Sequence, residues 1–214
     1  MKEELRAILS LSGPFPIFET DALPTNPQVL FRLWLKQAVD AGVREPHAMV
    51  LSTADTDGTP DARVLILKNS DARGWHFATT DSGPKGRQLS QNPSVALTFY
   101  WSELGRQVRI RGVATPAEAP ERDADFLARS IDARATVLVG RQSQTLSSQE
   151  ELNAAIAAQA LRIAGEPELI ADTWSLFVVA AHTVEFWQGA EDRRHNRVSY
   201  TLQQGIWSYH RLWP

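Results

Sequence analysis

Residues 48–80 read AMVLSTADTDGTPDARVLILKNSDARGWHFATT, in which three β-rich runs alternate with two short turns. Val, Leu, Ile, Thr, Phe and Trp recur in the runs, and β-branched and aromatic residues favour extended strands. The separating segments, 55–58 and 71–74, each begin with aspartate and end with glycine, which is typical of hairpin turns. The stretch therefore predicts consecutive antiparallel strands.

The same pattern continues toward the C-terminus. A second pair of strands is predicted at 94–101 and 105–115. Four later runs also have strand character, at 175–181, 183–189, 197–202 and 206–212. The sum is seven or eight strands, mostly in meander order.

Helices are predicted around these strands. Asn26-Pro27 supplies an N-cap and a first-turn proline for an amphipathic helix that stops near Gly42. A short polar helix is expected before Pro93, another at 121–129, and a longer one at 148–165 that opens with a capping box. An irregular link joins the last two. The fold class is therefore mainly β with peripheral helices, an antiparallel barrel and not a doubly wound parallel sheet.

Size and composition indicate one soluble globular unit. The chain has 214 residues, of which 43% are hydrophobic and 22% charged. We expect an N-terminal arm at 1–25, which contains three prolines, and a single domain at 26–214. A net charge of −3 means that the chain has no overall excess of positive charge with which to bind nucleic acid or an anionic membrane. The absence of cysteine and of a signal or membrane-spanning segment favours the cytoplasm.

Side chains of strand 105–115 should divide between two faces, because they alternate along a strand. Gln107, Arg109 and Arg111 are expected on a polar face. Val108, Ile110 and Val113 should largely occupy the other. A lone polar residue such as Gln107 usually faces solvent, so this pattern alone assigns no site.

Three cations lie on segments that could bind an anion. Arg63 and Lys68 belong to the second run, and Lys85 lies in a glycine-containing loop that leads into a helix. Arg63 and Lys85 could bind a phosphate with help from backbone amides at the helix start. The alternative interpretation is that these cations are exposed and bind only water. The five histidines form no metal-binding motif, and no P-loop, Rossmann or hydrolase fingerprint is present.

Residues 185–197 read EFWQGAEDRRHNR and place several cations beside Trp187. Arg193, His195 and Arg197 offer forked and ring donors that suit phosphate or a flat ring. A solvated turn between two strands is the simpler interpretation. The loop at 141–144, which contains Gln142 and Ser143, could equally be an ordinary surface loop.

Taken in order, these fragments resemble the pyridoxine/pyridoxamine 5′-phosphate oxidase family. The resemblance covers 27–214, and its C-terminal signature has the pattern E-F-W-Q-G followed by R-x-H-x-R. The other fragments are ARVLILK (62–68), SGPKGR (82–87), NPSVAL (92–97), RQVRIRG (106–112), RQS (141–143) and RLWP (211–214). The resemblance implies an FMN-binding split β-barrel that forms a homodimer, with FMN in two clefts at the interface.

Carried over by position, the resemblance implies cofactor contacts spread along the chain. Arg63 and Lys85 would bind the FMN phosphate, while amide groups and a flat neighbour suit the flavin ring. The implied FMN contacts are Arg63, Val64, Leu65, Ile66, Leu67, Lys68, Ala78, Thr79, Lys85, Gln107, Gln142, Ser143, Trp187 and Arg197.

The resemblance also implies a substrate site over the flavin. Lys68 and Arg129 match positions that hold a substrate phosphate, and Arg193 and His195 match the catalytic pair at the substrate ring. Asp125 and Ala133 depart from the pattern, since they stand where Tyr and Ser are expected. Pro84 also replaces a basic residue, and 1–10 lacks the basic arm that covers substrate.

The predicted activity is oxidation of pyridoxine or pyridoxamine 5′-phosphate to pyridoxal 5′-phosphate, with dioxygen as the acceptor. A related FMN-dependent oxidase that acts on another substrate, such as a phenazine-type precursor, is the first alternative, motivated by Asp125 and Ala133. A flavin- or vitamer-binding protein without turnover is the second. The sequence alone leaves vitamer preference and the role of the arm open.

Overall fold

Nine strands form one antiparallel sheet in the computed structural model, which describes residues 1–214. The main path runs β2-β1-β5-β6-β7-β4-β3, and β8 and β9 extend it from β7. The strands are β1 Ala48–Ala54, β2 Pro60–Ile66, β3 Asn69–Asp71, β4 Gly74–Thr80, β5 Ser94–Trp101, β6 Arg106–Pro116, β7 Trp174–Gln188, β8 Asn196–Gln203 and β9 Ile206–Arg211. The predicted mainly β, antiparallel fold is confirmed.

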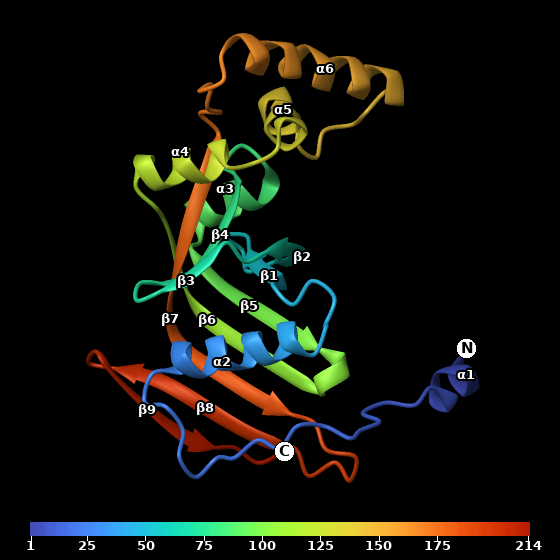
Figure 1. Ribbon diagram of the computed structural model, residues 1–214, viewed down its shortest axis with the longest axis vertical. Helices are drawn as coiled ribbons and strands as arrows, with labels where there is room; N and C mark the ends of the chain where they lie inside the picture. Colours follow the sequence, from blue (N-terminus) through green and yellow to red (C-terminus); the bar gives the residue numbers. More distant parts are fainter.

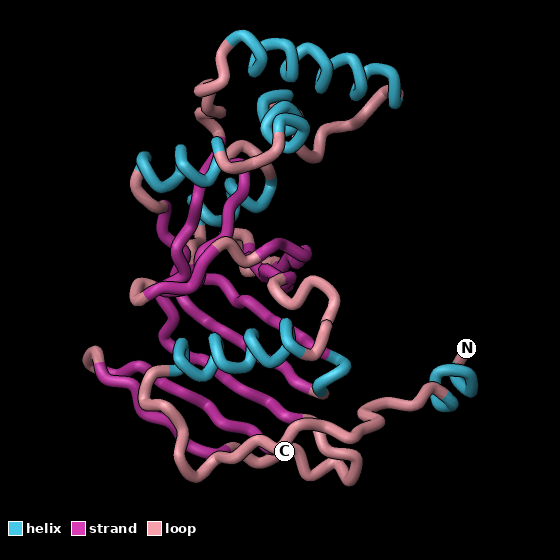
Figure 2. The backbone as a smooth tube through the Cα atoms, in the orientation of Figure 1, coloured by secondary structure: helices cyan, strands magenta, loops and turns pink.

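Six α-helices surround the sheet, together with a 3₁₀ turn at Ser102–Leu104. They are α1 Lys2–Ala7, α2 Pro27–Asp40, α3 Pro84–Gln91, α4 Ala119–Leu127, α5 Ile131–Val139 and α6 Gln149–Gly165. Helix α2 lies across the sheet, while α3 to α6 gather at one end of the molecule (Figures 1 and 2). Helices therefore lie at the periphery, as predicted.

Strand β7 connects the two parts of the sheet. Its first half pairs with β4 and its second half with β8, while β6 pairs along most of its length. The sequence predicted two strands here, at 175–181 and 183–189, on either side of His182. That prediction is wrong: the register shifts opposite His182, between Arg111 and Gly112, so one strand continues through a bulge.

Two other local predictions need correction. The expected irregular link contains α5, which Ser130 caps through its side chain and Gly140 ends in a left-handed conformation, φ 71°. Val113 is 40% exposed and lies on the polar side of β6, because strict alternation places it with Arg111. The predicted hairpins at 55–58 and 71–74 are both present.

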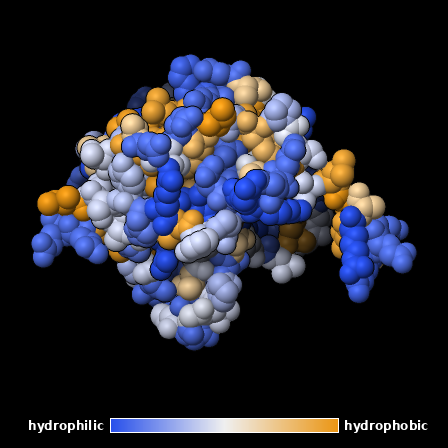
Figure 3. All heavy atoms as spheres, turned by 90° about the horizontal axis from the view of Figure 1, so that it is seen from below, coloured by the Kyte–Doolittle hydropathy of each residue, from blue (hydrophilic) through white to orange (hydrophobic).

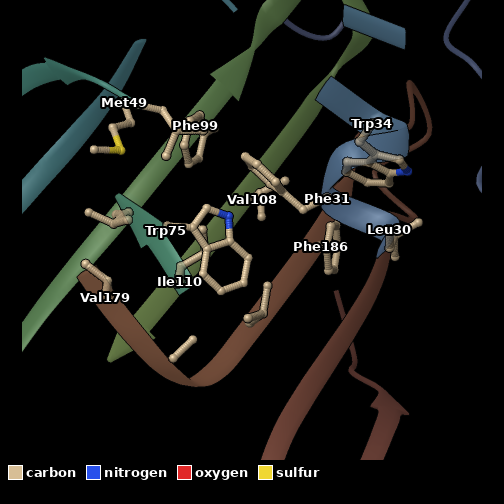
Figure 4. Packing of buried hydrophobic residues seen from close by; sticks show 14 of the residues in the cluster. Leu30, Phe31, Trp34, Met49, Trp75, Phe99, Val108, Ile110, Val179 and Phe186 are labelled. Carbon is tan, nitrogen blue, oxygen red and sulfur yellow. The ribbon is translucent and has the colours of Figure 1, made fainter. Parts of the chain in front are cut away.

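The core fills the space between the curled sheet and α2 (Figure 4). Asn26 caps α2 as predicted, since its side chain accepts a hydrogen bond from the amide of Gln28 at 2.8 Å. Phe31 and Trp34 of α2 are both buried, and the Trp34 ring meets Phe186 of β7 edge-on at 5.2 Å. This packing fixes α2 over the second half of β7.

The N-terminal arm contacts the domain through Phe18, which is 7% exposed and packs edge-on against Trp34 at 4.8 Å between ring centroids.

At the other end of the chain, Ile206 and Trp213 are 72% and 91% exposed. Apolar side chains are interspersed with polar ones over the end of the molecule viewed in Figure 3. No helix of the protein has the length and apolar character that crossing a membrane requires.

Candidate functional site

Arg63 and Lys85 form a cationic pair beside the N-terminus of α3. Nη1 of Arg63 donates to Oγ1 of Thr53 at 2.6 Å, and Nη2 forms an ion pair with Asp61. Lys85 lies in the first turn of α3 and is only 9% exposed. Burial, and then the charge of Arg63, lower the pKa of Lys85 below its usual value. A bound anion would relieve both effects.

The start of α3 is itself suited to an anion. Gly83 is the N-cap and no side chain caps the helix, so the first amides are free to donate to a ligand. Gly86 allows a close approach, because a Cβ at this position would overlap the backbone of Asp81. The amides and the two cations therefore form one arrangement that is suited to an anion.

Gln142 joins this arrangement from the loop after α5. Its Oε1 accepts hydrogen bonds from Nζ of Lys85 at 3.1 Å and from Oγ1 of Thr80 at 2.8 Å. A cavity of about 300 Å³ lies between this loop, α5 and α6, and Gln142 contributes to its wall. Ser143 is exposed and has a left-handed φ of 64°, which holds the loop in a tight turn.

Strand β2 presents an open edge next to this group. Val64 and Ile66 are 65% and 37% exposed, whereas Leu65 is partly buried and Leu67 is 9% exposed. β2 is the first strand of the main sheet path and pairs only with β1. A flat ligand or a second chain could therefore cover this edge.

Ala78 and Thr79 occupy β4, whose neighbour is the first half of β7. Thr79 is 3% exposed, and Ala78 is partly buried against the small cluster of Phe126 and Trp174. Ala78 thus lies between the sheet and α4.

A second group of predicted site residues gathers where β6, β7 and β8 run side by side. Trp187 pairs with Gln107 of β6 on one side and with Arg197 of β8 on the other. The rings of Trp187 and His195 lie 4.8 Å apart between centroids. The strand register therefore brings an amide, an indole, an imidazole and a guanidinium together.

His195 is oriented by the backbone of its own turn. Its Nδ1 accepts a hydrogen bond from the amide of Ala190 at 3.0 Å. In the neutral ring the proton then resides on Nε2, which is left to donate to a ligand. Arg193 is exposed and has a left-handed φ of 66°, and its Nη2 contacts Oγ of Ser10 in the arm at 3.2 Å. The turn holds both side chains without burying them.

Arg197 is fixed by a neighbouring carboxylate. Oε1 of Glu185 accepts from Nε and Nη2 of Arg197 at 3.0 and 2.9 Å, and Glu185 also pairs with Arg109. The side chain of Glu185 is 12% exposed, so these interactions are partly shielded from water. Glu185 therefore positions Arg197 beside Trp187.

A third group surrounds Asp125 of α4. Nζ of Lys68 forms an ion pair with Oδ1 of Asp125 at 3.0 Å, and Oδ2 accepts from Nε1 of Trp174 at 3.0 Å. The guanidinium of Arg129 lies over the Trp174 ring, 4.3 Å from its centroid. Burial lowers the pKa of Arg129, and the charge of Asp125 opposes this shift. Ala133 contributes only a carbonyl, which Nη2 of Arg129 reaches at 3.4 Å.

Within one chain these groups do not all meet. Trp174 and Trp187 stand at opposite ends of β7, so the Asp125 group and the Trp187 group are separated along the strand (Figure 1). Helix α3, which carries Lys85, lies with α4 to α6 at the Trp174 end of β7 (Figure 1), and Gln142 contacts Lys85 there. A single chain therefore carries two separate parts of the predicted site.

Some residues that orient the predicted FMN-binding side chains were not predicted from the sequence. Oγ1 of Thr53 donates a hydrogen bond to Oε1 of Gln88 at 2.5 Å, and the same Oγ1 accepts a hydrogen bond from Nη1 of Arg63. Thr53 and Gln88 are polar and buried, at 3% and 7% exposure, but nothing in their spacing distinguishes them from surface residues. Glu185 had a usable signal, since it is a carboxylate within the apolar run of β7.

Comparison with known proteins places this geometry in a family. Residues 35–173 match the family model described as pyridoxamine 5′-phosphate oxidase, and residues 174–214 match the pyridoxine 5′-phosphate oxidase C-terminal dimerisation region. The dimerisation region includes the exposed Ile206 and Trp213. These two matches support a homodimer.

Curated relatives named pyridoxine/pyridoxamine 5′-phosphate oxidase match over nearly the whole chain. The protein from Thermosynechococcus vestitus is 41% identical over 198 residues, covering 92% of this chain and 93% of the relative. That from Rubrobacter xylanophilus is 40% identical over 194 residues, covering 91% and 89%.

Solved structures agree with the fold. PhzG from Burkholderia lata, determined in complex with tetrahydrophenazine-1-carboxylic acid, has a TM-score of 0.89 and 32% identity, covering 94% of this chain and all of the other. A pyridoxamine 5′-phosphate oxidase-related, FMN-binding protein from Nostoc punctiforme has a TM-score of 0.73 at 17% identity, covering 91% and 100%. The split-barrel prediction is thereby confirmed. The chain belongs to the pyridoxine/pyridoxamine 5′-phosphate oxidase family of oxidoreductases.

Proposed function

We propose that this protein is an FMN-dependent oxidase that converts pyridoxine or pyridoxamine 5′-phosphate to pyridoxal 5′-phosphate, with dioxygen as the electron acceptor. The observation that carries the proposal is the buried ammonium of Lys85 beside Arg63, at the uncapped N-terminus of α3. Burial of an ammonium is costly unless an anion balances it, and Asp61, the carboxylate that acts on Lys85, is already paired with Arg63. The phosphate of FMN fits this requirement.

The cofactor would be held by residues of two kinds. Arg63, Lys85 and the first amides of α3 would bind its phosphate, with Gln142 and Ser143 nearby. Residues 64–68, at the end of β2 and just after it, would lie along the flavin with Ala78 and Thr79. Gln107, Trp187 and Arg197 would supply an amide, a flat ring and a cation to the remaining edges. When bound, FMN takes up a hydride equivalent from the C4′ carbon of the substrate and passes the electrons to dioxygen, which yields hydrogen peroxide.

Two chains would complete each site. The Lys85 group and the Trp187 group lie at opposite ends of β7, whereas a single FMN must contact both. A homodimer that places the Trp187 end of one chain against β2 of its partner would resolve this separation. The exposed Val64 and Ile66 of β2 and the matched dimerisation region support such an arrangement.

Arg193 and His195 would act on the substrate ring. Nε2 of His195 is available because Nδ1 is already engaged by Ala190, so the ring can donate to a polar edge of the substrate. The exposed guanidinium of Arg193 can stack on or clamp a flat pyridine ring. Lys68 and Arg129 would supply positive charge for the substrate phosphate.

The direct test is to purify the protein, record its flavin spectrum, and supply each phosphorylated vitamer while following aldehyde and peroxide. Bound flavin with stoichiometric peroxide and aldehyde is the expected result. A colourless protein that FMN cannot reconstitute would overturn the cofactor assignment. Flavin without turnover of either vitamer would favour a binding protein or another substrate.

The catalytic pair can be tested separately with Arg193→Ala and His195→Ala. Each should keep its flavin and lose about a hundredfold in kcat/KM for the vitamer, in the range typical of positioning and proton-transfer groups. Arg194→Ala is the matched control, since Arg194 lies in the same turn and pairs with Asp192. An Arg193→Ala variant with full turnover would remove Arg193 from the site.

One observation favours a second candidate function. Asp125 engages Lys68, one of the two cations proposed for the substrate phosphate. A substrate with a different anionic group, as in the complex of PhzG with tetrahydrophenazine-1-carboxylic acid, would need less positive charge there. Peroxide formation with a carboxylated polycyclic substrate, and none with either vitamer, would establish this alternative.

A further inference from the structure

Asp125 is held rigidly between two donors. One carboxylate oxygen lies 3.0 Å from the ammonium of Lys68, and the other accepts the indole N–H of Trp174 at 3.0 Å. The Asp125 side chain is 15% exposed and that of Lys68 is 29% exposed, so the pair is partly withdrawn from water. The two donors leave the carboxylate little freedom to turn away from Lys68.

Arg129 is the other cation of this cluster and is incompletely paired. Its Nε is buried without a hydrogen-bond partner, and Nη2 makes a single long contact, 3.4 Å, to the carbonyl of Ala133. The stacking on Trp174 fixes the plane of the guanidinium. Arg129 therefore has donors without a protein partner, whereas Lys68 is already engaged.

The cluster borders the strand proposed to line the flavin. Trp174 packs with Phe126 and Ala171, and Ala78 of β4 lies against the same small core. The backbone amide of Lys68 is also bonded to the carbonyl of His76 in β4, at 2.7 Å. Lys68, Asp125 and Arg129 thus carry two positive charges and one negative charge at the side of the proposed substrate site.

We propose that Asp125 is a specificity-determining residue that occupies Lys68, so that the Lys68–Arg129 cluster offers one net positive charge and binds a singly charged anion in preference to a phosphate dianion. This inference rests on the proposed function for the location of the substrate. A dianion placed at this cluster faces the fixed carboxylate and meets repulsion that a monoanion largely avoids. Oxidation of a phosphorylated substrate then proceeds with a weakened hold on its phosphate.

The test compares two unreactive ligands of the same shape. 4-Deoxypyridoxine 5′-phosphate and the corresponding 5′-sulfate lack the oxidisable group and, at pH 8, differ by one negative charge. Calorimetric titration of each into the flavin-loaded protein gives a ratio of dissociation constants without any turnover. The wild-type protein should bind the sulfate at least as tightly as the phosphate.

Asp125→Asn should shift this ratio about tenfold toward the phosphate, because the neutral amide frees Lys68 and removes the repulsion. Asp125→Ser is a second neutral variant, and flavin content with thermal unfolding shows whether each variant is folded. Asp125→Glu keeps the charge and should retain the wild-type preference. Asp123→Asn is the matched control, since Asp123 lies on the same helix, pairs with Arg122, and is itself a carboxylate at 31% exposure.

A ratio within twofold of wild type in both folded neutral variants would overturn the inference, as would a wild-type protein that binds the phosphate more tightly than the sulfate. Failure of the proposed function has a different signature. In that case neither vitamer is oxidised, whereas failure of the inference alone leaves vitamer oxidation intact and a ligand ratio that does not respond to Asp125→Asn.

Discussion

Glu185 binds Arg197 through a single carboxylate oxygen, which accepts from Nε at 3.0 Å and from Nη2 at 2.9 Å. The two residues lie on neighbouring strands, β7 and β8, and Arg197 is the register partner of Trp187. Nη1 of Arg197 also donates to the carbonyl of Trp213 at 2.8 Å, which ties the C-terminus to the same side chain. The guanidinium is thus held on two sides before any ligand binds.

Glu185→Gln should therefore weaken FMN binding by about tenfold, since the amide loses the charge that orients Arg197. Fluorescence titration of the apoprotein with FMN measures the effect. Glu103→Gln is the matched control, because Glu103 is exposed and bonds only to the hydroxyl of Ser102. Equal FMN affinities for the two variants would contradict a positioning role for Glu185.

Local features of the fold were predictable because their causes are local. The Asp/Gly turns at 55–58 and 71–74 specify hairpins by their own backbone preferences, and Asn26 caps α2 from the adjacent residue. Helix α5 was not predicted, because its mostly apolar sequence, IDARATVLV, has no clear polar face. The continuity of β7 through His182 depends on a bulge against β6, which no single-strand pattern reveals.

The site was predictable only as an ordered set of fragments. Motif order led to the family, and the comparisons confirm it, whereas the assignment of individual ligands stays a prediction. The pairing of Lys68 with Asp125 joins two segments far apart in the chain, and the orientation of Arg63 depends on Thr53 and Gln88 from other elements. Such contacts arise from tertiary packing, so the sequence pattern contains no trace of them.

The lowered pKa of Lys85 predicts a pH dependence of the apoprotein's stability. In the window just below the usual lysine value of 10.5, the unfolded chain binds more protons at this residue than the folded chain. The free energy of unfolding contributed by Lys85 therefore rises as the pH rises through that window. FMN phosphate would favour the charged form and reduce the rise.

Lys85→Met removes this titration, so urea unfolding of the apo variant should show a flatter stability profile between about pH 8 and 10 than the wild-type apoprotein. The same variant should bind FMN about a hundredfold more weakly, because it lacks a buried charge-assisted contact to phosphate. Lys36→Met provides the control, since Lys36 is 73% exposed in α2 and pairs with Asp40. Unchanged FMN affinity in Lys85→Met would remove Lys85 from the phosphate site.

Gly86→Ala should disrupt the start of α3. Alanine is intrinsically the better helix former, but its Cβ would overlap the backbone of Asp81, which cannot move as a side-chain end can. We expect a loss of about 2 kcal/mol in stability and weaker FMN binding. Gly165→Ala, at the end of α6, meets nothing within 4 Å and should be neutral or stabilising by up to about 1 kcal/mol. Thermal unfolding and FMN titration of the two variants separate the steric effect from helix propensity. Equal stability and equal FMN affinity in the two variants would contradict a steric role for Gly86.

Arg106 anchors the end of β7 that carries Trp187. The side chain is 2% exposed, its Nε donates to Oε1 of Gln188 at 2.8 Å, and its guanidinium lies 4.2 Å from the centre of the Trp34 ring. Burial lowers the pKa of Arg106 to about 10, because amide oxygens and an aromatic face replace the water that would otherwise solvate the charge. Gln188 in turn donates to the carbonyl of Leu104 at 2.8 Å, so the network ties β6 to β7.

Arg106→Ala should lower the free energy of unfolding by about 3 kcal/mol or more, because it leaves a cavity beside Trp34 and an unpaired oxygen on Gln188. Arg106→Met fills the space without the charge and should cost roughly half as much, since the desolvation of the guanidinium is also removed. Urea unfolding measures both, and Arg111→Ala, exposed on the same strand, should change stability by less than about 0.5 kcal/mol. If Arg106→Ala were no less stable than Arg111→Ala, the network would have no structural role. If it were unstable yet bound FMN normally, the end of β7 would be held independently of Arg106.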